Sequence, residues 1–364
     1  MSDLDMKELA SISNLDNRDT FLSVYVDLVD PRHSLHLQRR MKSIKRSVDD
    51  RTIEAALDDG LETLLSAFAD LSDGVRSAVG FIDLDSDFLR VGGLGTRIPT
   101  SVVLDASPYI LPLAQFQDSY ETFVLVLIDG QHCRIHLVHD ALGEEVAEHS
   151  HSALGAHRKG GWSQARYQRA RQGVVNSFFD GVAEDLGKLI SEIGSTRIIV
   201  AGAGTAKHNF YDRLPNHLAD LVIKIEDVDP RSASDDNLLR QFADIGRRAE
   251  EEQEMDDVAR LRRSLVIDEL AMTGIYDVLE AASQGRIEIL LISEGCSISG
   301  RKCEACDTYM RRHGQTCPSC GSDGNDVDLV NEAVEAAVRI SAEIEFTAAP
   351  FIEALGGVAA LLRW

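Results

Sequence analysis

The spacing of apolar and polar residues changes several times along the chain and divides its first third into strands and helices. Residues 20–28 alternate as a strand does, and residues 32–48 and 53–71 repeat apolar positions with a helical period. Two more strands are expected at 77–83 and 88–91. Residues 108–119 then predict a passage into a second domain.

A different order of elements follows in the middle of the chain. Apolar runs at 123–128 and 134–138 flank Asp129-Gly130, a dipeptide typical of hairpin turns. The pattern then predicts a strand, a helix, a strand, a helix and a strand, at residues 144–150, 165–193, 197–201, from 207, and 221–225. This alternation indicates an α/β layer with a partly parallel sheet. Gly202-x-Gly204 lacks the spacing of a nucleotide-binding loop, so a helix-start turn is expected there.

The last third begins at Pro230 with a linker of cap-forming residues and a charged helix that runs to about residue 262. The pattern predicts a helix, a strand, a helix and a final strand, at residues 268–285, 287–293, 330–341 and 342–347. A chain of 364 residues with 44% hydrophobic content suffices for two or three packed domains. We therefore expect an α/β protein, α+β overall, with domains at 1–118, 119–230 and 231–364.

Charge and composition narrow the class of protein. A net charge of −23 argues against indiscriminate binding to nucleic acid, so any basic segment stands out as a local site. No apolar stretch approaches the length of a membrane helix, and no cationic start precedes an apolar run. The expectation is a cytoplasmic protein without a signal peptide.

Residues 157–171 contain five cations and no carboxylate. The cations are Arg158, Lys159, Arg166, Arg169 and Arg171. Such a concentration of positive charge suits a polyanion, because bound phosphates release their counterions. The pair Gly160-Gly161 allows backbone angles that other residues avoid. The alternative interpretation is a solvated glycine turn before a basic helix start.

Four of the six cysteines form the pattern Cys303-x2-Cys306-x10-Cys317-x2-Cys320. Two such paired knuckles bring four thiolates to one tetrahedral ion, which predicts a structural metal ribbon over residues 301–322 that holds Zn²⁺ or, as the less favoured ion, iron. Incidental turns or disulfides are the alternatives, and a chain without a secretory signal disfavours disulfides. Cys133 and Cys296 are expected to be buried thiols and not ligands.

Three segments resemble the archaeal and eukaryotic class-I peptide chain release factors and Pelota. The run from His157 through Arg169 is similar to their Gly-Gly-Gln catalytic loop and its Arg-aromatic-x-Arg helix start. Residues 198–210 and 355–364 look like the family's strand–turn–helix segment and its terminus. The resemblance implies a three-domain release-factor-like architecture with a zinc-ribbon insertion in the third domain. It also implies that the third domain docks a translational GTPase of the elongation-factor type.

Two departures from the family bear on function. Trp162 stands where the family carries the glutamine that organises peptidyl-tRNA hydrolysis. No codon-reading Asn-Ile-Lys-Ser loop separates residues 37–48 from residues 49–57. The first of these helices is basic, and two interpretations stay open for it: phosphate contacts with ribosomal RNA, or an exposed face unrelated to RNA.

The resemblance and its departures favour a non-enzymatic factor similar to Balon-type ribosome hibernation factors. We expect it to be a monomer off the ribosome and to occupy the A site, with ribosomal RNA near the peptidyl-transferase centre as partner. The residues expected to bind are His157, Arg158, Lys159, Gly160, Gly161, Trp162, Ser163, Gln164, Arg166, Tyr167, Arg169 and Arg171. The alternative is a codon-independent peptidyl-tRNA hydrolase that uses the backbone donors of residues 160–162.

Overall fold

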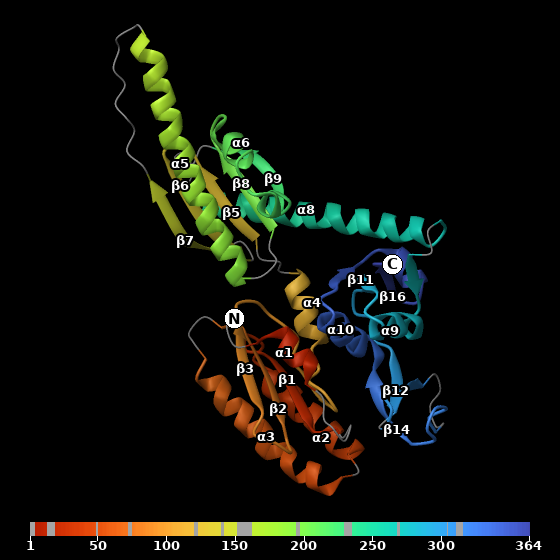
Figure 1. The fold of residues 1–364 in the computed structure, drawn as a ribbon. Helices are drawn as coiled ribbons and strands as arrows, with labels where there is room; N and C mark the ends of the chain where they lie inside the picture. Colours follow the sequence, from red (N-terminus) through yellow and green to blue (C-terminus); the bar gives the residue numbers. More distant parts are fainter. Residues whose placement is uncertain are drawn as a thin grey trace. The chain divides into compact units, whose positions relative to one another are not determined.

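The computed structural model describes most of the chain, in two compact units. The described residues are 4–12, 19–48, 50–71, 75–119, 123–139, 142–150, 162–193, 197–228, 235–267, 270–303, 305–310 and 316–364. Within them, the side chains of 119, 139, 142–145, 162–171, 192, 235–240 and 243 lie outside the description. One unit combines Met1–Ser119 with Asp256–Trp364, and the other is Tyr120–Met255. Figure 1 shows the elements of each.

The N-terminal layer is an antiparallel sheet with the strand order β3-β2-β1-β4. Its strands are β1 (Phe21–Asp27), β2 (Ser77–Asp83), β3 (Leu89–Leu94) and β4 (Ser101–Asp105), and its helices are α1 (Met6–Ser11), α2 (His33–Ser47) and α3 (Arg51–Ala69). Helices α2 and α3 share one core with the sheet, in which Leu37 of α2 and Leu57 of α3 are buried with Leu22 of β1. Only residues 48–50 join the two helices, as the sequence predicts. Strand β4 and helix α1 were not predicted.

The central layer is a five-stranded sheet with the order β7-β6-β5-β8-β9. Its elements are β5 (Phe123–Ile128), β6 (His132–His139), β7 (Leu142–Ser150), α5 (Trp162–Ile193), β8 (Arg197–Gly202), α6 (Ala206–Tyr211), α7 (Asn216–Ala219) and β9 (Val222–Asp227). Strands β5, β8 and β9 are parallel, whereas β6 and β7 are antiparallel. The predicted partly parallel sheet and its hairpin are therefore confirmed.

Alternate residues of β5 face two different cores, as the period of a strand requires. Val124, Val126 and Ile128 are buried with Phe179 of α5 and Phe210 of α6. Phe123, Leu125 and Leu127 face the opposite side, where Phe242 of α8 (Asp235–Ser264) is buried. The central sheet is thus covered by helices on both faces, which explains why β5 is apolar throughout.

The third layer is a mixed sheet with the order β10-β16-β11-β15, accompanied by a small sheet with the order β13-β12-β14. The large sheet contains β10 (Ala271–Thr273), β11 (Ile287–Ser293), β15 (Glu343–Thr347) and β16 (Val358–Leu362). The small sheet contains β12 (Ser299–Cys303), β13 (Tyr309–Met310) and β14 (Gly324–Asp328). The helices here are α4 (Leu111–Ser119), α9 (Ile275–Ser283), α10 (Leu329–Arg339) and α11 (Pro350–Ala354). The three layers confirm the α/β class, α+β overall.

Two predictions for the last third were wrong. The expected helix at 268–285 begins only at Ile275, because residues 271–273 form β10 and pair with β16. Gly274 separates the two elements with a φ of 85°, a backbone angle that favours glycine. Residues 342–347 do not form the final strand either, since β16 follows them and lies inside the sheet. A strand as short as β10 depends on pairing with its neighbours more than on an alternating pattern of its own.

Buried polar contacts connect the N-terminal layer to α10 within one compact unit. Asn331 of α10 is buried, and its Oδ1 accepts hydrogen bonds from the backbone N–H groups of Ile110 (2.9 Å) and Leu111 (3.0 Å). Glu335, one turn later, accepts a hydrogen bond from Ser107 Oγ at 2.7 Å. These two N–H groups lie at the start of α4 and have no acceptor within that helix, so Asn331 supplies one. The side chain of Asn331 therefore links the segment after β4 to α10.

We predict that Asn331→Leu loosens this link, because both N–H donors lose their acceptor in a buried site. The expected cost of local opening is about 2–6 kcal/mol, the sum for two buried unsatisfied donors. The measurement is amide hydrogen exchange at Ile110 and Leu111. Asn216→Leu, on the exposed first residue of α7, is the matched control. Unchanged protection at Ile110 and Leu111 would contradict the prediction.

Candidate functional sites: a basic helix start and a cysteine cluster

The basic segment lies at the start of α5. Residues 151–161, and with them the predicted site residues His157, Arg158, Lys159, Gly160 and Gly161, lie outside the described residues. Helix α5 begins at Trp162, three residues before the predicted start at 165. Its first turns carry the backbone of the remaining predicted residues, Ser163, Gln164, Arg166, Tyr167, Arg169 and Arg171, whose side chains are not described.

Positions 162, 166 and 169 share one face of α5, because they are separated by four and three residues. The first backbone N–H groups of an α-helix have no acceptor within the helix. At this helix end they belong to Trp162 and the residues that follow it. The start of α5 therefore combines backbone donors that have no acceptor within the helix with an aromatic residue and two arginines on one face.

The later turns of α5 hold this helix start in place. Phe179, Val182 and Leu186 are buried in the central core, and the Phe179 ring meets the Phe210 ring edge-on at 5.7 Å between centroids. Trp162 lies 17 residues before Phe179, a distance of about 25 Å along the helix axis. Figure 1 shows the first turns of α5 reaching past the ends of β6 and β7. The basic segment is thus carried at the end of a helix that is fixed in the core.

The turn between β8 and α6 is closed by its own lysine. Lys207 is buried, and its Nζ donates hydrogen bonds to the carbonyl oxygens of Gly202 (3.2 Å) and Gly204 (2.8 Å). The same Nζ pairs with Asp227, and this hydrogen bond lowers the pKa of the Asp227 carboxyl. A Cβ at Gly202 would lie 1.9 Å from the carbonyl oxygen of Ile128. The predicted helix-start turn is confirmed, and the buried role of Lys207 was missed by the sequence analysis.

An open groove lies between β7 and α5. It encloses about 690 Å³, and its lining comprises His149, Ser150, Gly173, Val174, Ser177, Phe178 and Gly181. The His149 Nε2 atom lies 3.5 Å from Asp185 Oδ2 of α5. The sequence analysis did not find this groove, because it depends on how the helix lies beside the edge strand.

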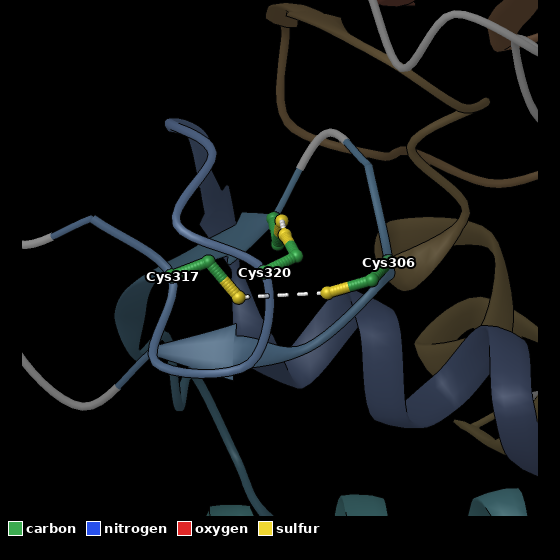
Figure 2. Close-up of side chains that lie close together, drawn as sticks. Cys306, Cys317 and Cys320 are labelled. Atoms are coloured by element: carbon green, nitrogen blue, oxygen red, sulfur yellow. Dashed lines mark hydrogen bonds between the residues drawn. The ribbon is translucent and has the colours of Figure 1, made fainter.

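The four predicted metal-ligand cysteines lie together. Their Sγ atoms are all within 4.8 Å of one another, and this is the only such cluster found among the described residues. The Sγ–Sγ distance is 3.4 Å from Cys303 to Cys320 and 3.5 Å from Cys306 to Cys317. Figure 2 shows the Sγ atoms of Cys306 and Cys317 pointing toward each other. Four thiolates around one tetrahedral ion at about 2.3 Å would lie about 3.8 Å apart, so the donor set fits such an ion.

The thiols of the cluster differ in acidity. Burial raises the pKa of the Cys303 thiol to about 12. Burial also opposes ionisation of Cys317, but backbone hydrogen bonds from Cys320 and Ser319 outweigh it and lower the pKa of Cys317 to about 6. A hydrogen bond from Ser322 lowers the pKa of Cys320. Backbone N–H groups aimed at sulfur stabilise thiolates, the form in which cysteine binds a metal.

The cysteine cluster is attached to α10 through a buried carboxylate. Glu332 accepts hydrogen bonds from Tyr309 Oη (2.8 Å) and from Lys302 Nζ (3.1 Å). Lys302 directly precedes the ligand Cys303, and Tyr309 lies on β13 between the two cysteine pairs. The small sheet is therefore held on the same helix that contacts the N-terminal layer. Cys133 is buried as predicted, and Cys296 is half-buried.

Within the described part of the chain, no helix has both the length and the apolar character needed to cross a membrane.

Comparisons with known proteins agree with the sequence motifs. Residues 108–247 match the model of the bacterial archaeo-eukaryotic release factor family 10. The chain is 22% identical to peptide chain release factor subunit 1 of Methanococcoides burtonii over 401 aligned residues, which cover 98% of this chain and 96% of that protein. It is 28% identical to the protein of the same name in Methanopyrus kandleri, over 60% of this chain and about half (51%) of that relative.

Two solved structures align over most of the chain. The archaeal translation termination factor aRF1 is 18% identical, with a TM-score of 0.27, and the alignment covers 99% of this chain and 96% of that one. Dom34 from S. cerevisiae is 10% identical, with a TM-score of 0.43, over 79% and 80% of the two chains. The sequence matches support a relationship between this chain and the archaeal and eukaryotic class-I peptide chain release factors.

Proposed function

We propose that this protein is a translation factor that occupies the A site of idle ribosomes and directs residues 157–171 toward the peptidyl-transferase centre. There it blocks the centre and neither hydrolyses peptidyl-tRNA nor reads a stop codon. Sequence similarity to proteins named peptide chain release factor subunit 1, over 98% of this chain for one of them, supports the ribosome as partner. The observation that carries the proposal is Trp162 at the first residue of α5.

A tryptophan at this position favours holding RNA over activating water. Its indole donates one hydrogen bond and accepts none, whereas the glutamine that the family carries here does both. Stacking on a nucleobase stabilises by about 1–3 kcal/mol. Arg166 and Arg169, on the same helix face, add phosphate contacts. The start of α5 therefore suits a segment that binds RNA and obstructs the peptidyl-transferase centre without activating water.

The connection between α2 and α3 supports the absence of codon reading. Helix α2 ends at Ser47 and α3 begins at Arg51, so three residues replace a codon-reading loop. The side chain of Asp50 is committed to capping α3, since it accepts a hydrogen bond from the Thr52 N–H at 2.8 Å. Such a short connection has no room for a loop that reads bases.

A second candidate function is peptidyl-tRNA hydrolysis without codon choice. The free N–H groups at the start of α5 favour it, because backbone donors aimed at one point stabilise a developing oxyanion. The two functions differ in whether the peptide is released.

We predict that the protein blocks the puromycin reaction and releases no peptide. The assay uses ribosomes that carry labelled peptidyl-tRNA and an empty A site, with puromycin alone as the positive control. Trp162→Ala should weaken the block, because base stacking is lost. Peptide release above background would support the hydrolase instead.

Charge reversal at Arg166 and Arg169 should weaken ribosome binding and make it less dependent on salt. Each lost phosphate contact is expected to lower the slope of log affinity against log salt by about one. Lys224→Glu with Arg248→Glu is the matched control, since both cations are exposed. The measurement is ribosome co-sedimentation at two salt concentrations. Equal loss in both double variants would mean that only net charge matters.

We also propose that the cysteine cluster holds one structural Zn²⁺, with Cys303, Cys306, Cys317 and Cys320 as ligands. When bound, the ion would close the small sheet by joining its two knuckles. The attachment to Glu332 then makes the ribbon a rigid part of the third layer.

Freshly purified protein should contain about one zinc per chain, and Cys303→Ser should abolish it. Loss of the metal should expose the ribbon to hydrogen exchange, while the central sheet stays protected, because it shares no core with the ribbon. Cys296→Ser is the control and should keep its zinc. Protein that contains no zinc before any chelator is added would refute the site.

The third domain is proposed to dock a translational GTPase of the elongation-factor type, and the protein to act in the cytoplasm. Both proposals rest on the family resemblance. Co-purification of the full chain with a candidate GTPase in the presence of a non-hydrolysable GTP analogue tests the first.

A further inference from the structure

The outer face of α2 carries cations that the fold leaves exposed. Leu37 and Met41 form the buried face of the helix, with 3% and 4% of their surface exposed. Arg39, Lys42 and Arg46 are exposed on the opposite face, at spacings of three and four residues. We call these three residues the α2 strip. Arg40 is also exposed, at its flank.

Among the described residues, no ion pair neutralises the strip. Arg32 and His36, nearer the start of the helix, lie 3.5 and 3.6 Å from Asp30. Lys45 pairs with Asp58 of α3 at 2.5 Å. Within the part of the chain that the structure describes, no carboxylate pairs with Arg39, Arg40, Lys42 or Arg46. Helix α2 itself contains neither aspartate nor glutamate.

The neighbouring helix makes this arrangement unusual. The exposed positions of α3 include Glu54, Asp58, Asp59 and Glu62, in a chain of net charge −23. Carboxylates are therefore abundant one helix away, and yet only Asp58 reaches across to α2. Like charges one turn apart destabilise a helix by a few tenths of a kcal/mol per pair. The helix macrodipole stabilises the charges of Lys45 and Arg46 in the last turn of α2, but not those of Arg39 or Lys42 in its middle.

The residues of α2 indicate which kind of polyanion the strip would bind. Helix α2 has no Phe, Tyr or Trp on which an unpaired base could stack, and its two histidines, His33 and His36, both contact Asp30 before the strip begins. Its apolar face is buried in the domain core, so it cannot enter a lipid interface. The two ends of the strip, Arg39 and Arg46, are seven positions apart, about 10 Å along the helix, which is long enough to follow several phosphates of a duplex. Arginine matches phosphate oxygens with two parallel hydrogen bonds.

We propose that the α2 strip is a second RNA-binding site, which binds the phosphate backbone of double-helical RNA without regard to sequence. This goes beyond the proposed function, which assigns RNA contacts to residues 157–171 alone. Two separate anchors then position the protein: the start of α5 in the central layer and the α2 strip in the N-terminal layer. Phosphate contacts fix orientation and carry no base information, as expected where no codon-reading loop exists.

The test compares two triple charge reversals in the full chain. Arg39→Glu, Lys42→Glu and Arg46→Glu remove the strip, and glutamate keeps the helix propensity high. The control is Lys224→Glu, Arg248→Glu and Arg263→Glu, three exposed cations outside α2, which changes the net charge by the same amount. Binding to a 20-base-pair RNA duplex is measured across a salt series, and far-UV circular dichroism checks that both variants are folded.

We expect the strip variant to bind the duplex at least tenfold more weakly at low salt, with a salt slope lower by about three. The control should stay within about twofold of the unmodified protein. Equal affinities of the strip variant and the control would overturn the proposal. So would binding of the unmodified protein to vesicles of anionic lipid with no binding to the duplex.

Ribosomes separate this proposal from the proposed function. At saturating protein, the strip variant should still block puromycin but need a higher concentration to do so, whereas the Arg166 and Arg169 reversal should impair the block itself. A strip variant with an unchanged concentration dependence would refute the second site and leave the proposed function intact. If the unmodified protein binds the duplex through the strip but never blocks the puromycin reaction, the second RNA-binding site is supported and the proposed function is wrong.

Discussion

The burial of α5 against the central sheet is the interaction on which the arrangement of this protein's basic segment depends. Phe179, Val182 and Leu186 lie in the same core as β5 and β8, so the helix cannot rotate without exposing them. Because an α-helix is stiff over a few turns, this core also determines where the first turn of α5 lies. The proposed block of the peptidyl-transferase centre would need such a rigid support, since a loosely held loop would lose binding energy to ordering.

Charge is distributed so that positive sites are few and local. The chain as a whole is strongly acidic, which limits binding to nucleic acid in general. Against that background the start of α5 and the exposed face of α2 concentrate cations in different layers. Where the fold needs a cation for itself, as at Lys207, it buries the ammonium group and provides an acceptor. Structural cations and the cations proposed to contact RNA therefore differ in burial and in partner.

Many elements could be predicted from the sequence because their residues repeat with one clear period. The runs at 123–128 and 287–293 match β5 and β11 at both ends, since the first is apolar throughout and the second is apolar except at Glu288 and Ser293. Strands β10 and β16 were missed for the opposite reason. Ala271–Thr273 is too short to show a period, and it becomes a strand only by pairing with residues 359–361. The cysteine spacing predicted four clustered thiols, because local turns alone bring each pair together.

The sequence by itself determined the resemblance to release factors, the tryptophan at position 162, the four clustered cysteines and the presence of cations, because each depends on residue identity and local spacing. Only the tertiary structure decided which of these cations form ion pairs within the fold. Arg39 and Lys45 are alike in the sequence, yet Lys45 meets Asp58 across the helix pair and Arg39 faces outward. The same holds for Asn331, whose role depends on Ile110 and Leu111, more than two hundred residues away in the chain. Contacts between distant segments follow from packing, and no local pattern encodes them.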